Sequence, residues 1–444
     1  MSLTALTWLL GYCLLACLSF LNPLFGALGY LHEYYNRPEL QWWGDELPAL
    51  RWNLIISIIL GVTFLVRRSS LRPLKSLKNL TVPWLLVLNA TMIIVSAVLA
   101  VWPSESWDWT IQWTKTALIF PLLLIGVTRS RGAFNAIAAA NVAGALWWGW
   151  DSWRDPKRQA GRLVGVGSGD TQDDNAAAAH LVTVLPLAVM FLLVEKDKRL
   201  RALGLVAVPF IINTIILCNS RSAVVAMVVA AGATMLLVRS QYRLKLGGVA
   251  LAMGLAFFML ADEQFISRQQ TTANYEEDNS AQQRLIAWRA GYELVKDHPL
   301  GTGGRGFHFL SPIYMPEIVA AYNGDLRGPH NTYVMVASEW GVIGLVAFIG
   351  YISATFVMLG RVKKRANGQD FYYWRALAVQ VGFIAYLIAS AFTARLYAEV
   401  GYWFSGLAFV LYRLQYTEIA EQANPVSEGT EIERTRDGID RSAA

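Results

Sequence analysis

The sequence is poor in charge and in cysteine. Only 16% of its 444 residues are Asp, Glu, Lys or Arg, whereas 55% are hydrophobic and the mean hydropathy is +0.37. This composition excludes a soluble protein, because soluble domains carry about 25% charged residues. Cys13, Cys17 and Cys218 lie in or beside apolar runs and lack the spacing of metal ligands. We therefore expect no disulfide framework and no cysteine metal site.

The basic segment of a cleaved signal peptide is also lacking. No Lys or Arg precedes the lipobox-like residues 14–17 (Leu-Leu-Ala-Cys), so the first helix is expected to stay uncleaved. The formal net charge of +6 would suggest nucleic acid if the protein were soluble. In a membrane protein, however, Lys and Arg first report the side of the membrane on which a loop lies. We expect no nucleic-acid partner.

What the sequence does have is a succession of long apolar runs. A bilayer core of about 30 Å needs roughly 20 apolar residues per helix, and helices satisfy their backbone polar groups internally. Trp and Tyr gather at the ends of these runs, where amphipathic rings favour the headgroup level. We predict an all-α integral membrane protein with about 12 transmembrane helices. The predicted spans are near 3–20, 53–66, 82–101, 111–127, 133–150, 176–194, 202–218, 222–238, 245–261, 332–360, 376–392 and 401–413.

Lys and Arg are concentrated in every second loop between these spans. Such loops tend to stay in the cytoplasm, so both termini are expected inside and residues 262–331 outside. The tail is polar, has no apolar period and is expected to be disordered in the cytoplasm. The basic loops are 67–78, 129–131, 196–201, 239–245 and 361–365. The predicted parts of the chain are helices 1 to 9 over 1–261, the external loop over 262–331 between helices 9 and 10, helices 10 to 12 over 332–415, and the tail over 416–444.

The external loop contains a predicted amphipathic helix. Ser280, followed three residues later by Gln283, is a capping box that opens a helix through about Asp297. Apolar residues recur along it at helical spacing and predict a face that packs on the membrane domain. They are Leu285, Trp288, Tyr292 and Val295.

Two other patterns could indicate a nucleotide or a metal. Residues 301–306 read Gly-Thr-Gly-Gly-Arg-Gly, but the Lys-Ser/Thr ending and the preceding strand of a nucleotide-binding loop are lacking, so a flexible turn is expected. Two acidic groups could bind a hard cation, yet neither forms a recognisable ligand loop. Solvated carboxylates are the preferred interpretation, and no metal or cofactor is expected. The acidic groups are Asp170, Asp173 and Asp174, and Glu276, Glu277 and Asp278.

Several arginines fall on the outer side, against the usual charge bias of membrane proteins. They are Arg162, Arg221, Arg284, Arg289, Arg305 and Arg327. A snorkelling or solvated side chain would explain any one of them. Guanidinium forks match diphosphate oxygens, so an anionic ligand at the outer face explains them together. His330 stands at the outer mouth of the tenth span, where alone it could equally be an interfacial hydrogen-bonding residue.

Three segments, taken as a set, resemble the shared core of the O-antigen ligase and O-antigen polymerase superfamily. Their order, spacing and common outer location carry the resemblance, and the first five spans have no comparable signal. With Asp-Asn at 174–175, the set covers roughly residues 160–360. The segments are Asn-Ser-Arg-Ser at 219–222; Arg-Leu-Ile-Ala-Trp at 284–288 followed by His-Pro-Leu-Gly-Thr-Gly at 298–303; and His-Asn-Thr-Tyr at 330–333 ahead of Glu-Trp-Gly-Val-Ile-Gly at 339–344.

This resemblance implies metal-independent glycosyl transfer at the periplasmic face of a bacterial inner membrane. The donor would be an undecaprenyl-diphosphate glycan and the acceptor a hydroxyl, which for the ligases belongs to lipid A-core. By motif, Arg221 and Arg284 correspond to the family's essential arginines and His330 to its essential histidine. Guanidinium groups can stabilise a leaving phosphate without a metal, and a neutral imidazole suits a base near pH 7. The further substrate-binding residues expected are Arg162, Arg289, Arg305 and Arg327.

Other functions stay open at this point. An O-antigen or exopolysaccharide polymerase and a protein O-oligosaccharyltransferase use the same donor chemistry, and the motifs do not separate them from a ligase. A secondary transporter would carry coupling groups near the bilayer midplane, often in two repeated halves. This sequence has no such repeat and gathers its polar residues at the outer rim, so a glycan ligase is the preferred interpretation.

Overall fold

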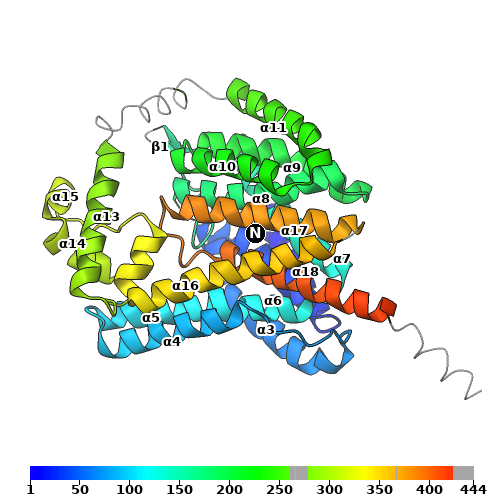
Figure 1. The fold of residues 1–444 in the computed structure, drawn as a ribbon, viewed down its shortest axis with the longest axis horizontal. Helices are drawn as coiled ribbons and strands as arrows, with labels where there is room; N and C mark the ends of the chain where they lie inside the picture. The colour runs from blue at the N-terminus through cyan, green and yellow to red at the C-terminus, as the bar shows by residue number, and fades with distance from the viewer. Residues whose placement is uncertain (160, 172, 261–265, 267–278, 367, 424–444) are drawn as a thin grey trace, which may run out of the picture.

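The computed structural model describes residues 1–159, 161–171, 173–260, 266, 279–366 and 368–423. Most of these residues are helical, and most of the helices run along one direction as a bundle (Figure 1). The bundle helices are α1 (Leu3–Ser19), α2 (Leu24–Tyr35), α3 (Trp52–Arg67), α4 (Val82–Val98), α5 (Pro103–Trp113), α6 (Phe120–Val127), α7 (Arg131–Arg154), α8 (Asp174–Val194), α9 (Lys198–Leu217), α10 (Arg221–Leu237), α11 (Ser240–Leu260), α16 (Thr332–Arg365), α17 (Asp370–Ser390) and α18 (Glu399–Ala423). A π-helix, η4 (Thr114–Ile119), joins α5 to α6.

Smaller elements lie mostly in the connections. Helices α13 (Asn279–Asp297), α14 (Gly306–Tyr314) and α15 (Pro316–Ala321) lie at the left-hand end of the bundle in Figure 1. Strands β1 (Arg158–Gln159) and β2 (Arg162–Leu163) form an antiparallel hairpin. We call the end where α8, α10 and α16 begin the site end, and the end that carries Arg67, Arg131 and Arg365 the basic end. The short helices are η1 (Pro38–Leu40), η2 (Gly44–Glu46) and η3 (Arg68–Ser70).

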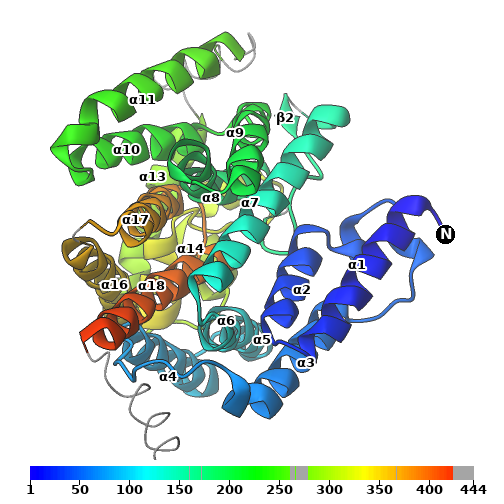
Figure 2. The same ribbon diagram turned by 90° about the vertical axis from the view of Figure 1, so that its right-hand side faces the viewer.

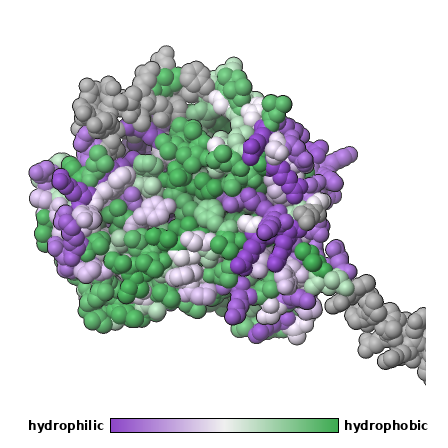
Figure 3. All heavy atoms as spheres, viewed as in Figure 1, coloured by the Kyte–Doolittle hydropathy of each residue, from purple (hydrophilic) through white to green (hydrophobic). Residues whose placement is uncertain are grey.

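The length and apolarity of the helices suit a membrane protein. Six helices in the described part of the chain are long and apolar enough to cross a membrane, and three shorter helices are also apolar. Figure 3 shows a broad hydrophobic surface between polar regions toward the two ends. The prediction of an all-α membrane protein is therefore confirmed, whereas the number of spans is not fixed by these criteria. The six are Trp52–Ser70, Pro103–Val127, Asp174–Val194, Lys198–Leu217, Thr332–Arg365 and Asp370–Ser390, and the shorter three are Leu3–Ser19, Val82–Val98 and Arg221–Leu237.

Helices α8 and α17 form the centre of the bundle. They bury 72% and 78% of their most apolar windows inside the protein, whereas the span that contains α3 buries 17%. Gly382 lets α17 approach α8 closely, because a Cβ atom there would collide with the carbonyl of Thr183. Figure 2, viewed along the bundle, shows α1 and α11 at its periphery.

Helix α2 is an element that the apolar runs did not indicate. It contains His32 and Glu33, which interrupt the hydropathy, and the carboxylate of Glu33 is buried and accepts a hydrogen bond from Asn53 Nδ2 at 2.7 Å. Because α2 returns between them, α1 and α3 run side by side in the same direction. Two contacts fix this register: Ser19 Oγ lies 2.8 Å from Thr63 Oγ1, and Tyr12 Oη donates to Trp52 O at 2.8 Å.

The return of the chain through α2 affects where α1 begins within the bundle. Helix α1 ends beside Arg67, whose Nε donates to the carbonyl of Phe20 at 2.9 Å. Helix α18 also ends at the basic end, where Glu418 pairs with Arg131 at 2.5 Å. The start of α1 therefore lies away from the end where α18 finishes, because α2 returns between α1 and α3. The side of the membrane on which each terminus lies stays a prediction.

The predicted tail also begins too early. Helix α18 continues to Ala423, past the predicted boundary at residue 416, because its last turns contact the basic loops. Thr417 Oγ1 accepts from the backbone N–H of Lys75 at 3.1 Å, and Glu421 pairs with Arg72 at 2.7 Å. The rest of the predicted tail, residues 424–444, lies outside the described residues.

The amphipathic helix of the external loop is confirmed as α13, but its predicted buried face is wrong. Leu285 and Tyr292 are 49% and 62% exposed. The buried face consists instead of Ala287, Ala290 and Leu294, which pack in one apolar cluster with Phe307 of α14 and with Met315. Trp288 is half-buried, and its Nε1 donates to Pro329 O at 3.1 Å.

Candidate functional site

The predicted motifs meet at the site end. Helix α8 begins at Asp174, α10 at Arg221 and α16 at Thr332, and all three starts lie on the left of Figure 1, near α13. The first two starts are joined directly, because Ser220 Oγ donates to Asn175 Oδ1 at 2.8 Å. Helix starts carry partial positive charge and unpaired N–H groups, which favour anions.

Backbone strain is concentrated in the same motifs. Four non-glycine residues of the described chain have positive φ: Asn219 at 50°, Arg305 at 59°, Asn323 at 55° and His330 at 46°. Such conformations cost about 1–3 kcal/mol each and persist where the surroundings hold them, often at functional sites. Three of these four residues lie in the predicted site segments, next to or at Arg221, Arg305 and His330.

The strained backbone of His330 is held on both sides. On its N-terminal side, Pro329 O accepts from Trp288 Nε1 of α13 at 3.1 Å. On its C-terminal side, Asn331 caps α16, and its Oδ1 accepts from the N–H groups of Tyr333 and Val334 at 2.9 and 3.1 Å. The imidazole is therefore placed at the start of α16 by two helices at once.

The surrounding protein and the neighbouring arginines lower the pKa of His330. The side chain is accessible to solvent, yet the protein around it and the positive charge of Arg284 lower its pKa. Asp173 opposes this shift and Arg327 adds to it. A lowered pKa leaves the imidazole unprotonated near pH 7, which is the state that a general base needs. The structure thus places Arg284 and Arg327 near His330, while their roles stay predictions.

A second histidine, His308, lies near His330 and was missed by the sequence analysis. Burial lowers its pKa to about 4, and the charges of Arg305 and His330 contribute. Its Nδ1 is buried and has no hydrogen-bond partner among the described residues. Nothing in the local sequence marks this residue, because its position depends on how α14 packs against α13.

Arg162 has a carboxylate partner. Its Nη1 lies 2.8 Å from Asp174 Oδ2, so the β1–β2 hairpin is tied to the start of α8. Asp173 caps the same helix by accepting from the N–H of Ala176 at 2.9 Å. Arg162 thus lies at the site end. Its charge is largely compensated by Asp174, whereas the predicted role in substrate binding needs a positive charge that is available to an anion.

The remaining predicted arginines lie around this end. Arg305 lies 5.8 Å from the ring centre of Trp109, and Arg327 lies 3.4 Å from that of Tyr322, so both guanidinium groups face aromatic rings. Arg289 is exposed on α13. Arg221 and Arg284 are half-buried at the starts of α10 and α13, respectively.

Asp170 is not the solvated carboxylate that was expected. Its Oδ1 accepts from Tyr34 Oη at 2.5 Å, and its Oδ2 accepts from the N–H of Glu399 at 2.8 Å. Its backbone carbonyl accepts from Arg395 Nη1 at 2.9 Å. Within the described ranges, no group of three or more His, Cys, Asp or Glu is placed to hold a metal ion. Glu276, Glu277 and Asp278 lie outside those ranges.

The glycine-rich segment 301–306 is not a flexible turn. It is largely buried against a break in α16 at Gly341, whose φ is 70°. The N–H groups of Thr302 and Gly303 donate to Glu339 O at 3.1 and 2.9 Å, and that of Gly304 donates to Ser106 Oγ at 2.9 Å. Because these N–H groups are used within the chain, the segment does not form a phosphate-binding loop. It supports the first half of α16, which carries His330 at its start.

Comparison with known protein families decides the identity of this region. Residues 205–349 match the family model described as Wzy_C, O-antigen ligase. This segment belongs to the O-antigen ligase superfamily. The match includes Arg221, Arg284 and His330, and the family consists of glycosyltransferase-like ligases and polymerases. A comparison with curated proteins found no match.

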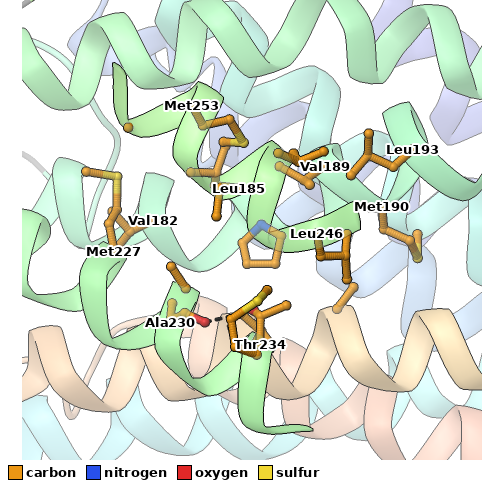
Figure 4. Close-up of a pocket in the computed structure, with 18 of the residues that line it drawn as sticks. Val182, Leu185, Val189, Met190, Leu193, Met227, Ala230, Thr234, Leu246 and Met253 are labelled. Atoms are coloured by element: carbon orange, nitrogen blue, oxygen red, sulfur yellow. Dashed lines mark hydrogen bonds between the residues drawn. The ribbon is translucent and has the colours of Figure 1, made fainter. Parts of the chain in front are cut away.

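The O-antigen ligase segment also borders an apolar cavity of about 390 Å³. Helices α8, α10, α11 and α17 line it, and Figure 4 shows labelled side chains of α8, α10 and α11 around it. Val224 and Met227, in the first two turns of α10, lie on its wall, so the cavity begins one turn below Arg221. Its lining is almost wholly hydrophobic, which suits a lipid chain.

Proposed function

We propose that the protein is a glycosyltransferase that moves a glycan from an undecaprenyl-diphosphate carrier to an acceptor hydroxyl, most specifically as an O-antigen ligase that acts on lipid A-core. The observation that carries this proposal is the neutral His330, held with a strained backbone beside Arg284 at the end where α10 begins with Arg221. The match of the same residues to the O-antigen ligase family supports it.

In this proposal Arg221 and Arg284 hold the diphosphate. Cleavage of the bond between the sugar and the diphosphate leaves negative charge on the phosphate, and fixed guanidinium groups stabilise that charge. The start of α10 adds its dipole to the charge of Arg221. Arg289, Arg305 and Arg327 contribute positive potential at the rim, while Arg162 orients the start of α8 through Asp174.

His330 acts on the acceptor. Its neutral ring takes the proton of the acceptor hydroxyl while the hydroxyl oxygen bonds to the anomeric carbon. The bonding electrons of the glycosyl–phosphate bond leave with the diphosphate, and the imidazolium then returns its proton to solvent. No metal takes part in these steps, because the guanidinium groups carry the charge compensation.

In this proposal the basic end of the bundle faces the cytoplasm and the site end faces the periplasm of a bacterial inner membrane. The Lys and Arg residues at the basic end support this orientation, because basic loops tend to stay in the cytoplasm. The apolar cavity beneath Arg221 fits the isoprenoid tail of the donor, with the diphosphate at its mouth. The C-terminal helix then ends in the cytoplasm.

The test is genetic and chemical. Deletion of the gene should leave lipid A-core free of long glycan while the lipid-linked polymer accumulates. A change in glycan chain length with normal attachment would indicate a polymerase instead. If both lipid-linked and attached glycans are unchanged, the proposed function is wrong.

A further inference from the structure

Arg395 is a buried arginine that none of the site motifs includes. It lies in the connection between α17 and α18 and is only 1% exposed. Its Nη1 donates to Asp170 O at 2.9 Å, while Nε and Nη2 have no hydrogen-bond partner among the described residues. Burying a guanidinium with two unpaired donors is costly, so its presence requires a compensating role.

The main chain of Arg395 contacts the first residue of α16. Its N–H donates to Thr332 Oγ1 at 2.7 Å, and the same hydroxyl donates to Thr393 O at 2.9 Å. The carbonyl of Arg395 accepts from Tyr386 Oη at 2.6 Å, which anchors the connection to α17. Thr332 follows His330 by two residues, so this contact fixes the start of α16 directly after the histidine.

The side chain of Arg395 contacts the other half of the site. Asp170 precedes the start of α8, and its carboxylate is held by Tyr34 and by the N–H of Glu399. From there the chain reaches Asn175, which accepts from Ser220 Oγ at 2.8 Å, next to Arg221. One residue therefore connects the start of α16 with the segment that supports the starts of α8 and α10.

We propose that Arg395 is a positioning residue that fixes His330 relative to the diphosphate-binding start of α10. This inference rests on the proposed function. Arg395 is too deeply buried to touch a substrate, so it acts through Thr332 and Asp170. Misplacement of a reacting group by about 1 Å can lower the rate about 10²-fold, so a tie of this kind matters for turnover more than for binding.

The experiment compares Arg395→Lys with Arg375→Lys, a matched control. Arg375 is also buried, but it lies at the basic end, where it pairs with Glu195 and donates to Asn135 Oδ1 at 2.8 Å. In each purified variant we would measure the thermal midpoint, the Kd for undecaprenyl diphosphate, and the pH profile of kcat for transfer from an undecaprenyl-diphosphate oligosaccharide.

Arg395→Lys should lower kcat about 10- to 100-fold, with Kd within about threefold of the wild type. Its pH profile should shift, because His330 moves relative to the charge of Arg284. Arg375→Lys should lower the thermal midpoint but leave kcat and the pH profile of the folded protein unchanged. Thr332→Val keeps the buried charge and removes only the hydroxyl tie, so it should reproduce the loss of kcat even if Arg395→Lys folds poorly. The double variant should be less than additive.

Two results would overturn the inference alone. In the first, wild-type protein is active and both Arg395→Lys and Thr332→Val keep its kcat and pH profile. In the second, these variants lose affinity for undecaprenyl diphosphate as severely as they lose turnover. Failure of the wild-type protein to use any lipid-diphosphate donor would instead overturn the proposed function, and this inference with it.

Discussion

Three arginines at the basic end of the bundle pair with carboxylates, whereas three at the site end contact an aromatic ring or a backbone carbonyl and form no ion pair within the described residues. The pairs at the basic end are Arg375 with Glu195, Arg131 with Glu418, and Arg72 with Glu421. At the site end, Arg305 and Arg327 lie over Trp109 and Tyr322, and Arg395 binds the carbonyl of Asp170. Paired charges tie helices and loops together, while cations without a carboxylate leave positive potential for an anionic ligand.

The backbone differs in the same way between the two ends. Asn219, Arg305 and His330 hold positive φ in segments of the site end. A polypeptide keeps such strain where surrounding contacts enforce it, and around His330 those contacts come from Trp288 and Thr332. The comparison teaches that contacts at the site end hold a strained backbone in place, whereas the three ion pairs at the basic end neutralise charge.

Removal of the imidazole of His330 should have the largest effect of any change at the site end. His330→Ala should lower turnover about 10²- to 10⁴-fold, the usual loss for a missing general base, while affinity for undecaprenyl diphosphate stays nearly normal. Binding and turnover must be measured separately on equally inserted protein. If His330→Ala loses donor affinity as severely as Arg284→Ala, His330 belongs to the diphosphate-binding cluster and is not the base.

Lysine replacements distinguish a bidentate grip from simple charge. Arg221→Lys and Arg284→Lys should fail almost as badly as the alanine variants, by about 10²- to 10³-fold in kcat, because an ammonium cannot reproduce the guanidinium fork. Arg131→Lys at the basic end is the control and should change turnover little, since its pair with Glu418 is partly exposed. Recovery of activity by lysine at both site positions would favour a purely electrostatic role.

Two glycines of α16 test whether the break in this helix carries backbone strain. Gly341→Ala should cost about 1–3 kcal/mol in the free energy of unfolding, because its φ is 70° and a Cβ atom would collide with the backbone of Leu300. Gly360 lies further along the same helix, and a Cβ atom added there would have no other atom within 4 Å. Gly360→Ala should therefore be neutral or slightly stabilising. Thermal or denaturant unfolding in detergent measures both. Equal effects would mean that the break in α16 carries no strain.

The smallest expected effect is a pH dependence. Because the pKa of His330 is lowered from 6.5, the acidic limb of kcat/KM should lie below pH 6.5. His308 has a pKa of about 4 in the folded protein and 6.5 when unfolded, so protonation favours unfolding as pH falls between these values. His308→Asn should therefore weaken the loss of stability between pH 6.5 and 4. An acidic limb above pH 6.5 would contradict the assignment of His330.

Sequence patterns predicted the elements that depend on local periodicity. The apolar runs correspond closely to α4, α8, α9, α10 and α17, and the capping box predicted α13. Helix α2 was missed because Glu33 is buried through its contact with Asn53, which hydropathy cannot anticipate. The buried face of α13 was predicted from its large apolar residues. In the structure, Ala287 and Ala290 are instead on the face that packs against α14.

The candidate site was predictable only where motifs carry it. Arg221, Arg284 and His330 lie in segments with a family resemblance, and the family match includes all three. Arg395 and His308 were missed because their meaning depends on distant contacts, with Asp170 and with the neighbourhood of His330. The segment 301–306 was predicted to be flexible because it is rich in glycine. Composition does not reveal that its backbone binds α16 at the break in that helix.

The most direct measurement is transfer by the purified protein in the presence of a chelator. Wild-type protein, an undecaprenyl-diphosphate O-antigen and lipid A-core would be combined with excess EDTA, and the product would be followed as glycan attached to lipid A-core. The account predicts that transfer continues in EDTA and is nearly abolished in His330→Ala. Transfer that stops in EDTA and returns with Mg²⁺ or Mn²⁺, or that survives in His330→Ala, would contradict it.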